Sequence, residues 1–150
     1  MDVIMELVYP KPKHPPWRRS QKLAALKTGG KEVVGGGVVP GYGGDYRGEN
    51  FLGENKHTSK GGRITLKREW FKKILKEALL SNGKDPVLTI EVDKIFYKFA
   101  LTLDIPKWKD KIITPTKMSF IFIPANYDFT IPLYFTWGIG EEIWKVELLP

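Results

Sequence analysis

The sequence predicts an α/β or α+β protein, in which a mixed central sheet is flanked by helices and extended by further strands at the C-terminal end. Two observations predict this class. An amphipathic helical pattern at 65–80 is followed by a β-branched run at 87–92, which is typical of a helix leading into a buried strand. After residue 93 the apolar segments have only the character of strands. With 150 residues, 42% of them hydrophobic, the chain is expected to form a single domain with a sizeable core.

The N-terminal part is expected to contain a strand, an arm and a helix. Residues 1–9 form a short apolar segment that predicts a strand, and residues 10–16 alternate prolines with basic side chains, which predicts an extended basic arm. Residues 17–27 predict a helix, because a proline precedes them and Gly29-Gly30 follows them. Trp17 is expected to belong to the core.

The next part is expected to consist of short strands and loops. Residues 31–34 predict a short strand, and the glycine-dense segment 35–44 predicts a loop that is mobile or lies close to a ligand. A hairpin is expected from 45–48 and 51–56, and a polar connection at 58–62 follows it.

The strongest element is the helix at 65–80. Its apolar side chains recur at helical spacing, and lysines and arginines occupy most of the remaining positions. Ser81-Asn82-Gly83 is expected to end it. The apolar stripe consists of Leu66, Trp70, Ile74, Leu75, Ala78 and Leu79. The strands expected after it are 87–92, 96–103, 118–123, 130–136 and 143–148.

Composition limits the chemistry and suggests a polyanionic partner. The chain has no cysteine and two histidines, which excludes disulfide scaffolds and thiolate sites and leaves carboxylates, lysines and hard metal ions. Residues 1–84 hold 17 Lys+Arg and 8 Asp+Glu, a net charge of +9, whereas residues 85–150 hold 7 and 9, a net charge of −2. Such a basic half suits nucleic acid, although a solvated lysine-rich surface has the same composition. Without a signal peptide or a long apolar run, the protein is expected in the cytoplasm (the host cytoplasm if the source is viral) with no membrane partner.

Asp45, Glu54 and Lys56 form the one constellation that suggests catalysis. If the hairpin turns between Glu49 and Asn50, paired positions sum to 99, and Asp45 lies opposite Glu54 with the Cβ atoms roughly 5 Å apart. Carboxylates at this distance repel unless a cation lies between them, and Mg²⁺ suits one or two carboxylates with bound waters. Lys56 shares the face of Glu54 and could stabilise charge on a phosphate. An ordinary strand with charged side chains is the alternative interpretation.

Residues 17–92 resemble the PD-(D/E)xK nuclease superfamily, and within it the archaeal-type Holliday junction resolvases, including those carried by viruses. That family has a basic first helix, a strand, a glycine-rich loop, an Asp, an E-x-K motif, an amphipathic helix and another strand. The matching segments are Arg18-Arg19-Ser20-Gln21, Lys31–Val34, Gly35-Gly36-Gly37, Gly44-Asp45, Glu54-Asn55-Lys56-His57-Thr58, Lys67–Leu80 and Pro86-Val87-Leu88.

The resemblance implies a restriction-endonuclease-like core at 17–93, preceded by the arm and followed by the β extension at 94–150. It implies that Asp45, Glu54 and the carbonyl of Asn55 ligate Mg²⁺, with Mn²⁺ as a substitute, and that Lys56 is the catalytic lysine. The family usually has Glu on the first helix where this chain has Gln21, which can hold a water but adds no charge. The expected DNA contacts are Arg18, Arg19, Lys31, Thr58, Lys60, Arg63, Lys67 and Arg68.

The function expected from this resemblance is a Mg²⁺-dependent endonuclease that resolves four-way DNA junctions as a homodimer, without a small-molecule cofactor. The apolar tail strands or the long helix are the expected dimer interface. A duplex-nicking or restriction-type nuclease and a catalytically silent DNA-binding module are the alternatives.

Overall fold

The structure, a computed structural model, describes residues 16–33, 44–58, 63–103, 112–114, 119–121, 127–136 and 142–150. The expected N-terminal strand and nearly all of the expected basic arm and the glycine-dense loop lie outside these residues, as does Lys60.

The described residues form an α+β fold with two helices and an open, mixed sheet of eight strands in the order β1-β2-β3-β5-β6-β10-β9-β7. The β3–β5 and β7–β9 pairs are parallel, and the other pairs are antiparallel. β4 and β8 form a separate antiparallel pair. The elements are α2 (Pro16–Thr28), β1 (Lys31–Glu32), β2 (Tyr46–Arg47), β3 (Phe51–Thr58), β4 (Arg63–Thr65), α3 (Arg68–Leu80), β5 (Asp85–Val92), β6 (Ile95–Leu101), β7 (Ile112–Ile113), β8 (Ser119–Ile121), β9 (Leu133–Phe135) and β10 (Trp144–Leu149).

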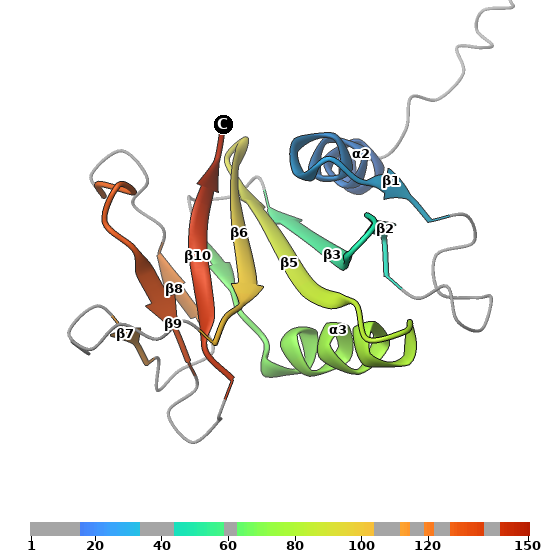
Figure 1. The fold of residues 1–150 in the computed structure, drawn as a ribbon. Helices are drawn as coiled ribbons and strands as arrows, with labels where there is room; N and C mark the ends of the chain where they lie inside the picture. The colour runs from blue at the N-terminus through green and yellow to red at the C-terminus, as the bar shows by residue number, and fades with distance from the viewer. Residues whose placement is uncertain are drawn as a thin grey trace, which may run out of the picture.

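The two helices cover opposite faces of the sheet (Figure 1). Leu52, Leu88 and Ile90 pack with α3, whereas Tyr46 and Phe96 pack with Ala24 and Ala25 of α2. Because successive side chains of a strand point to opposite faces, this division assigns every position of β3 to one helix or the other. The even-numbered residues of β3 therefore face α3, and the odd-numbered residues face α2.

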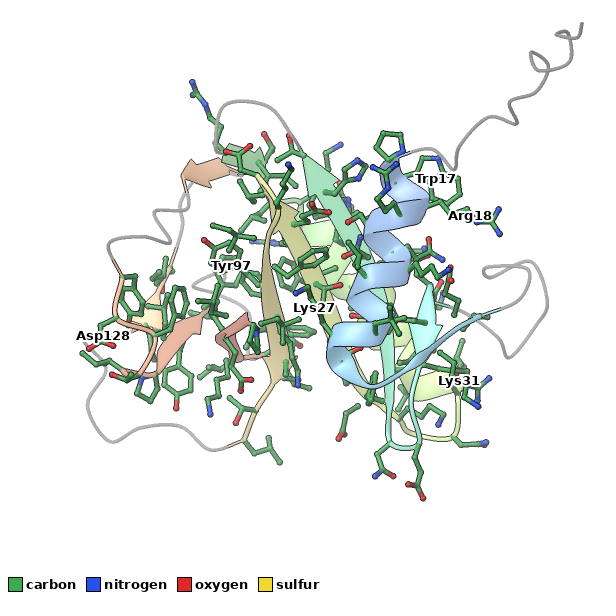
Figure 2. All side chains as sticks on the ribbon, turned by 90° about the horizontal axis from the view of Figure 1, so that it is seen from above. Trp17, Arg18, Lys27, Lys31, Tyr97 and Asp128 are labelled. Atoms are coloured by element: carbon green, nitrogen blue, oxygen red, sulfur yellow. The ribbon has the colours of Figure 1, made fainter. Side chains whose placement is uncertain are left out.

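Helix α2 has the predicted extent, and its ends follow from its sequence. Pro16 occupies the first position, where its missing N–H costs no hydrogen bond. At the other end Gly29 has a φ of +80°, and the N–H of Gly30 donates to the carbonyl of Ala25 at 2.8 Å. This arrangement closes the last turn of the helix and depends on glycine at the left-handed position. Trp17, expected in the core, is instead 54% exposed. Figure 2 shows it at the start of the helix.

The hairpin of β2 and β3 has the predicted register. Tyr46 pairs with Gly53 and Arg47 with Leu52, so paired positions sum to 99. The N–H of Gly48 donates to the carbonyl of Phe51 at 2.9 Å, which closes the turn at the predicted place. A Cβ atom at Gly53 would lie 2.0 Å from the ring of Tyr46. Glycine therefore allows the ring to cross the strand at this pair.

Helix α3 begins later than predicted because its first expected residues belong to another element. Arg63–Thr65 forms β4, and Lys67 at the N-cap has extended backbone angles of −107° and 130°. The β4–β8 pairing joins residues far apart in sequence, which local periodicity does not report. The apolar stripe was also partly wrong, because Phe71 is buried whereas Leu79 is 73% exposed.

The C-terminal strands other than β8 continue the same sheet, and they contribute to the same core. β10 pairs with β6 on one side and with β9 on the other. Phe71 of α3 contacts Phe135 and Trp144 with ring centroids 5.2 and 5.1 Å apart. Phe135 and Trp144 are buried, so these two tail aromatics are not available to a partner.

Among the described residues, neither helix has the length and apolar character that crossing a bilayer requires.

Candidate functional site

Asp45 and Glu54 lie side by side at the end of the β2–β3 pairing. The N–H of Asp45 donates to the carbonyl of Gly53 at 2.8 Å, although the register pairs Gly53 with Tyr46, so the regular ladder ends at Tyr46. The charge of Glu54 raises the pKa of Asp45, so the two carboxylates lie close enough to repel each other. Glu54 is only 4% exposed, which is uncommon for a carboxylate and calls for a compensating charge.

The backbone of β3 aims Asn55 at the carboxylate of Asp45. The carbonyls of Phe51 and Gly53 accept hydrogen bonds from the β2 side, and the N–H of Asn55 donates to Oδ2 of Asp45 at 2.8 Å. The N–H and C=O of one residue in a strand point in the same direction. The carbonyl of Asn55 is therefore directed to the same edge of β3 as Asp45, the edge at which the resemblance implied a ligand.

Two lysines approach the buried carboxylate of Glu54. Lys56 Nζ lies 3.4 Å from Glu54 Oε2, and Lys73 Nζ of α3 lies 3.1 Å from the same oxygen. Lys56 also lies 5.2 Å from the ring centroid of Trp70, a distance at which the ring attracts the ammonium group. Glu54 Oε1 is buried and accepts no hydrogen bond from the described residues. One oxygen of Glu54 is thus neutralised, and the other has the unfilled coordination that a cation would satisfy.

In the metal-free protein the two carboxylates repel each other. Burial, followed by repulsion from Glu54, raises the pKa of Asp45 from 3.8 to about 6, and the hydrogen bond from Asn55 and the charges of the lysines only partly oppose this. For Lys73, burial lowers the pKa, but the charge and the hydrogen bond of Glu54 outweigh it and raise the pKa above its ordinary value. A divalent cation between the carboxylates would relieve the repulsion that raises the pKa of Asp45.

The oxygens present fit a hard cation, with one limit. Asp45 and Glu54 supply carboxylate oxygens and Asn55 a carbonyl, the donors that Mg²⁺ prefers. Within the described ranges no group of three or more Asp, Glu, His or Cys side chains gathers at one point. A cation held here would therefore depend on two carboxylates, a carbonyl and water.

A buried polar network holds the back of the site on the α2 side. Thr89 Oγ1 donates to Asn55 Oδ1 at 2.8 Å and accepts from Tyr46 Oη at 2.9 Å, and Asn55 Nδ2 donates to Ser20 Oγ at 2.8 Å. These bonds tie β2, β3, β5 and α2 to one another. Since Asn55 is held from both sides, its backbone has little freedom to turn away from Asp45.

Gln21 contacts the site through a backbone group. Its Nε2 donates to the carbonyl oxygen of Asp45 at 3.2 Å. The N–H of Val33 donates to the same carbonyl at 3.0 Å. Gln21 therefore restrains the backbone that carries the carboxylate, and its amide adds no charge.

The expected DNA-contacting residues do not form one cluster. Arg19 and Thr58 lie together at the end of β3, whereas Lys31 lies beside β2 near the start of β3. Because a strand rises about 3.3 Å per residue, the two ends of β3 are roughly 20 Å apart. Arg18, Arg19, Lys31, Arg63 and Lys67 are exposed, and Thr58 and Arg68 are partly buried.

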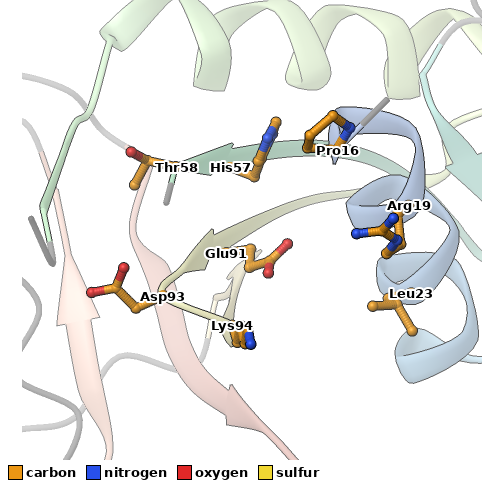
Figure 3. Close-up of a pocket in the computed structure, with 8 residues that line it drawn as sticks. All are labelled: Pro16, Arg19, Leu23, His57, Thr58, Glu91, Asp93 and Lys94. Carbon is orange, nitrogen blue, oxygen red and sulfur yellow. The ribbon is translucent and has the colours of Figure 1, made fainter. Parts of the chain in front are cut away.

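Arg19 and Thr58 line a cavity of about 300 Å³ on the α2 side of the sheet (Figure 3). Its wall carries both signs of charge, since Arg19 and Lys94 line it together with Glu91 and Asp93. His57 and Glu91 are cross-strand partners on the face opposite to Glu54. The cavity is therefore distinct from the carboxylate site.

Sequence reasoning missed Lys73 and the positioning role of Trp70. The helical pattern places Lys73 among the polar positions of this helix and Trp70 in its apolar stripe. Their spacing of three residues places them on one face of α3, which is a usable signal once that face is known to cover β3.

Comparisons of the chain with protein-family models, curated proteins and solved structures find no match.

Proposed function

We propose that the protein is a Mg²⁺-dependent, structure-selective DNA endonuclease that resolves four-way junctions, with a restriction-endonuclease-like core. One observation carries the proposal: Asp45 lies close to a buried Glu54 that has an oxygen without a hydrogen-bond partner among the described residues, and Lys56 stands on the same face as Glu54. The order of helix, antiparallel strands, helix and parallel strand supports the core assignment.

Each residue has a defined role in this proposal. Asp45, Glu54 and the Asn55 carbonyl would hold the cation. The chemistry that bound Mg²⁺ supplies in such sites is activation of a water and stabilisation of charge on the phosphate. Lys56, held by the face of Trp70, places a positive charge where the scissile phosphate gains negative charge. Gln21 keeps Asp45 in place through its backbone.

The substrate assignment is supported by charge and by the symmetry of the product. Basic residues occur at the start of α2 and in and after β4, and such side chains suit phosphate backbones. Resolution of a junction requires two symmetric cuts, so a two-fold homodimer is part of the proposal.

A catalytically silent DNA-binding module is the second candidate. It is favoured by the two lysines that already neutralise Glu54 and by the uncharged Gln21. In this case the buried carboxylate would be structural.

Incubation of labelled four-way junction, duplex and single strand with Mg²⁺ or with EDTA separates these functions. The expected result is paired symmetric nicks on the junction, dependent on Mg²⁺ and abolished by Asp45→Asn and Glu54→Gln. Glu49→Gln, in the exposed turn of the same hairpin, is the matched control and should cleave normally. Cleavage of plain duplex would favour a nicking nuclease, and junction binding without cleavage would favour the silent module.

A further inference from the structure

We infer that Lys73 is an exchangeable counter-ion that two glutamates share and that sets the affinity of the carboxylate site for its cation. The inference rests on the proposed function, because it assumes that Asp45 and Glu54 bind a divalent ion. It concerns a residue of α3 to which neither the resemblance nor the E-x-K pattern assigns a role.

The geometry places Lys73 between two acceptors. Its Nζ lies 3.1 Å from Glu54 Oε2 and 3.7 Å from Glu77 Oε2, one helical turn further along α3. Glu54 and Glu77 each also have a buried Oε1 that has no hydrogen-bond partner in the described part of the chain. Lys73 is thus shared by two carboxylates, neither of which is fully satisfied.

The exposed fractions of the two lysine side chains indicate which one is more easily displaced from Glu54. The side chain of Lys73 is 55% exposed, and that of Lys56 is 31% exposed and lies over Trp70. Lys73 therefore reaches the buried Glu54 from the solvent side on a flexible stem. A divalent cation bound to Glu54 would displace Lys73 more easily than Lys56. Glu77 lies close enough to accept the ammonium group of the displaced Lys73.

The exchange makes Lys73 a positioning residue rather than a catalytic one. In the metal-free protein it neutralises a buried carboxylate, which would otherwise be destabilising. Binding of the cation then competes with the ion pair of Lys73 and Glu54. Transfer of the Lys73 ammonium group to Glu77 lowers the free-energy cost of breaking that pair. The contacts of Lys56 and Lys73 hold the Glu54 carboxylate in place until the cation arrives.

Titration calorimetry with Mn²⁺ tests the competition. Lys73→Met is expected to raise the affinity about threefold or more. Lys72→Met, an exposed lysine of the same helix, controls for the loss of one positive charge. Lys73→Arg is expected to restore affinity near that of the wild type. Equal effects of Lys73→Met and Lys72→Met would overturn the inference.

Glu77→Gln tests the transfer and leaves Lys73 in place if Lys73→Met should not fold. It is expected to weaken Mn²⁺ binding at least about twofold more than Glu69→Gln, an exposed glutamate of α3. Where Lys73→Met folds, the effect of Glu77→Gln should vanish in that background. The same loss with and without Lys73, or no greater loss than with Glu69→Gln, would show that no transfer occurs.

Asp45→Asn separates the two levels of the argument. If this change leaves Mn²⁺ binding intact, the carboxylate site is not the metal site, and the proposed function and the exchange both fail. If Asp45→Asn abolishes binding while Lys73→Met behaves as Lys72→Met, only the exchange fails. In EDTA, Lys73→Met should also lower the urea midpoint of unfolding more than Lys72→Met, because the former leaves Glu54 less well neutralised.

Discussion

The backbone N–H of Asn55 donates a 2.8 Å hydrogen bond to the carboxylate of Asp45, and this bond links the Asp to the E-x-K strand. Its consequence is that the carboxylate is oriented before any cation binds. Asp45 nevertheless has a pKa raised to about 6 by burial and by Glu54, so orientation has an electrostatic cost. The raised pKa predicts that the effect of the Asp45 carboxylate on stability depends on pH.

Asp45→Asn should stabilise the metal-free protein at neutral pH. The folded pKa of about 6 exceeds the ordinary 3.8, so the ionised carboxylate lowers the free energy of unfolding above pH 6. This loss is relieved as the pH falls from 6 toward 4. We expect Asp45→Asn to gain about 1–3 kcal/mol at pH 7.5 and almost nothing at pH 3.5.

Urea unfolding in EDTA at several pH values measures this difference. Asp85→Asn, at an exposed position, is the control and should follow the wild type at each pH. Parallel pH profiles for Asp45→Asn and the wild type would contradict the assignment. With saturating Mg²⁺ the order should reverse, because only the wild type would gain from binding.

Trp70→Leu should slow cleavage by releasing Lys56. The ammonium lies 5.2 Å from the ring centroid, and a contact of this kind contributes enough to hold a flexible side chain. We expect a rate about threefold to tenfold lower, against about a hundredfold for Lys56→Met. Single-turnover cleavage of a four-way junction measures both, and the double variant should be no slower than Lys56→Met alone. A slower double variant would mean that Trp70 acts independently of Lys56.

Thr89→Val should destabilise the protein by about 1–3 kcal/mol, because the change keeps the shape but leaves Asn55 and Tyr46 without their buried partner. Thr89→Ser retains the hydroxyl and should retain most of the stability. Urea midpoints compare the three proteins. A midpoint for Thr89→Val equal to that of the wild type would show that the network contributes no net stability.

Phe135→Ala should lower the stability of the whole protein and not of the tail alone. Phe135 is buried and stacks on Phe71 of α3 with an interplanar angle of 20°. We expect a loss of about 3–5 kcal/mol in one cooperative transition. Ile131→Ala, at an exposed site, is the control. Circular dichroism and tryptophan fluorescence should give the same midpoint, and two separate transitions would show that the tail unfolds independently.

Local rules were enough to predict the hairpin and both helices. The turn at Glu49-Asn50 sets the register, which pairs Tyr46 with Gly53 and so brings the neighbouring Asp45 close to Glu54. Proline and glycine likewise set the ends of α2. These features depend on residues within a few positions of one another, which a single sequence displays directly.

Features that depend on distant contacts were not predictable in this way. Lys73 has the sequence context of a surface lysine, and only the packing of α3 on β3 brings it to Glu54. The strand at Arg63–Thr65 exists through its pairing with β8, and Trp17 is exposed because α2 turns its alanines toward the sheet. Each outcome depends on the relative placement of whole elements, which periodicity does not specify.

The position of β10 has a consequence for the order of assembly. Because β10 lies between β6 and β9, the described β7 and β9 reach the rest of the sheet only through it. Strands made earlier must therefore wait for a later one before they can join. Folding of this chain should be slow for its size. The segment between β6 and β10 must close into a long loop before the stabilising contacts between these strands can form.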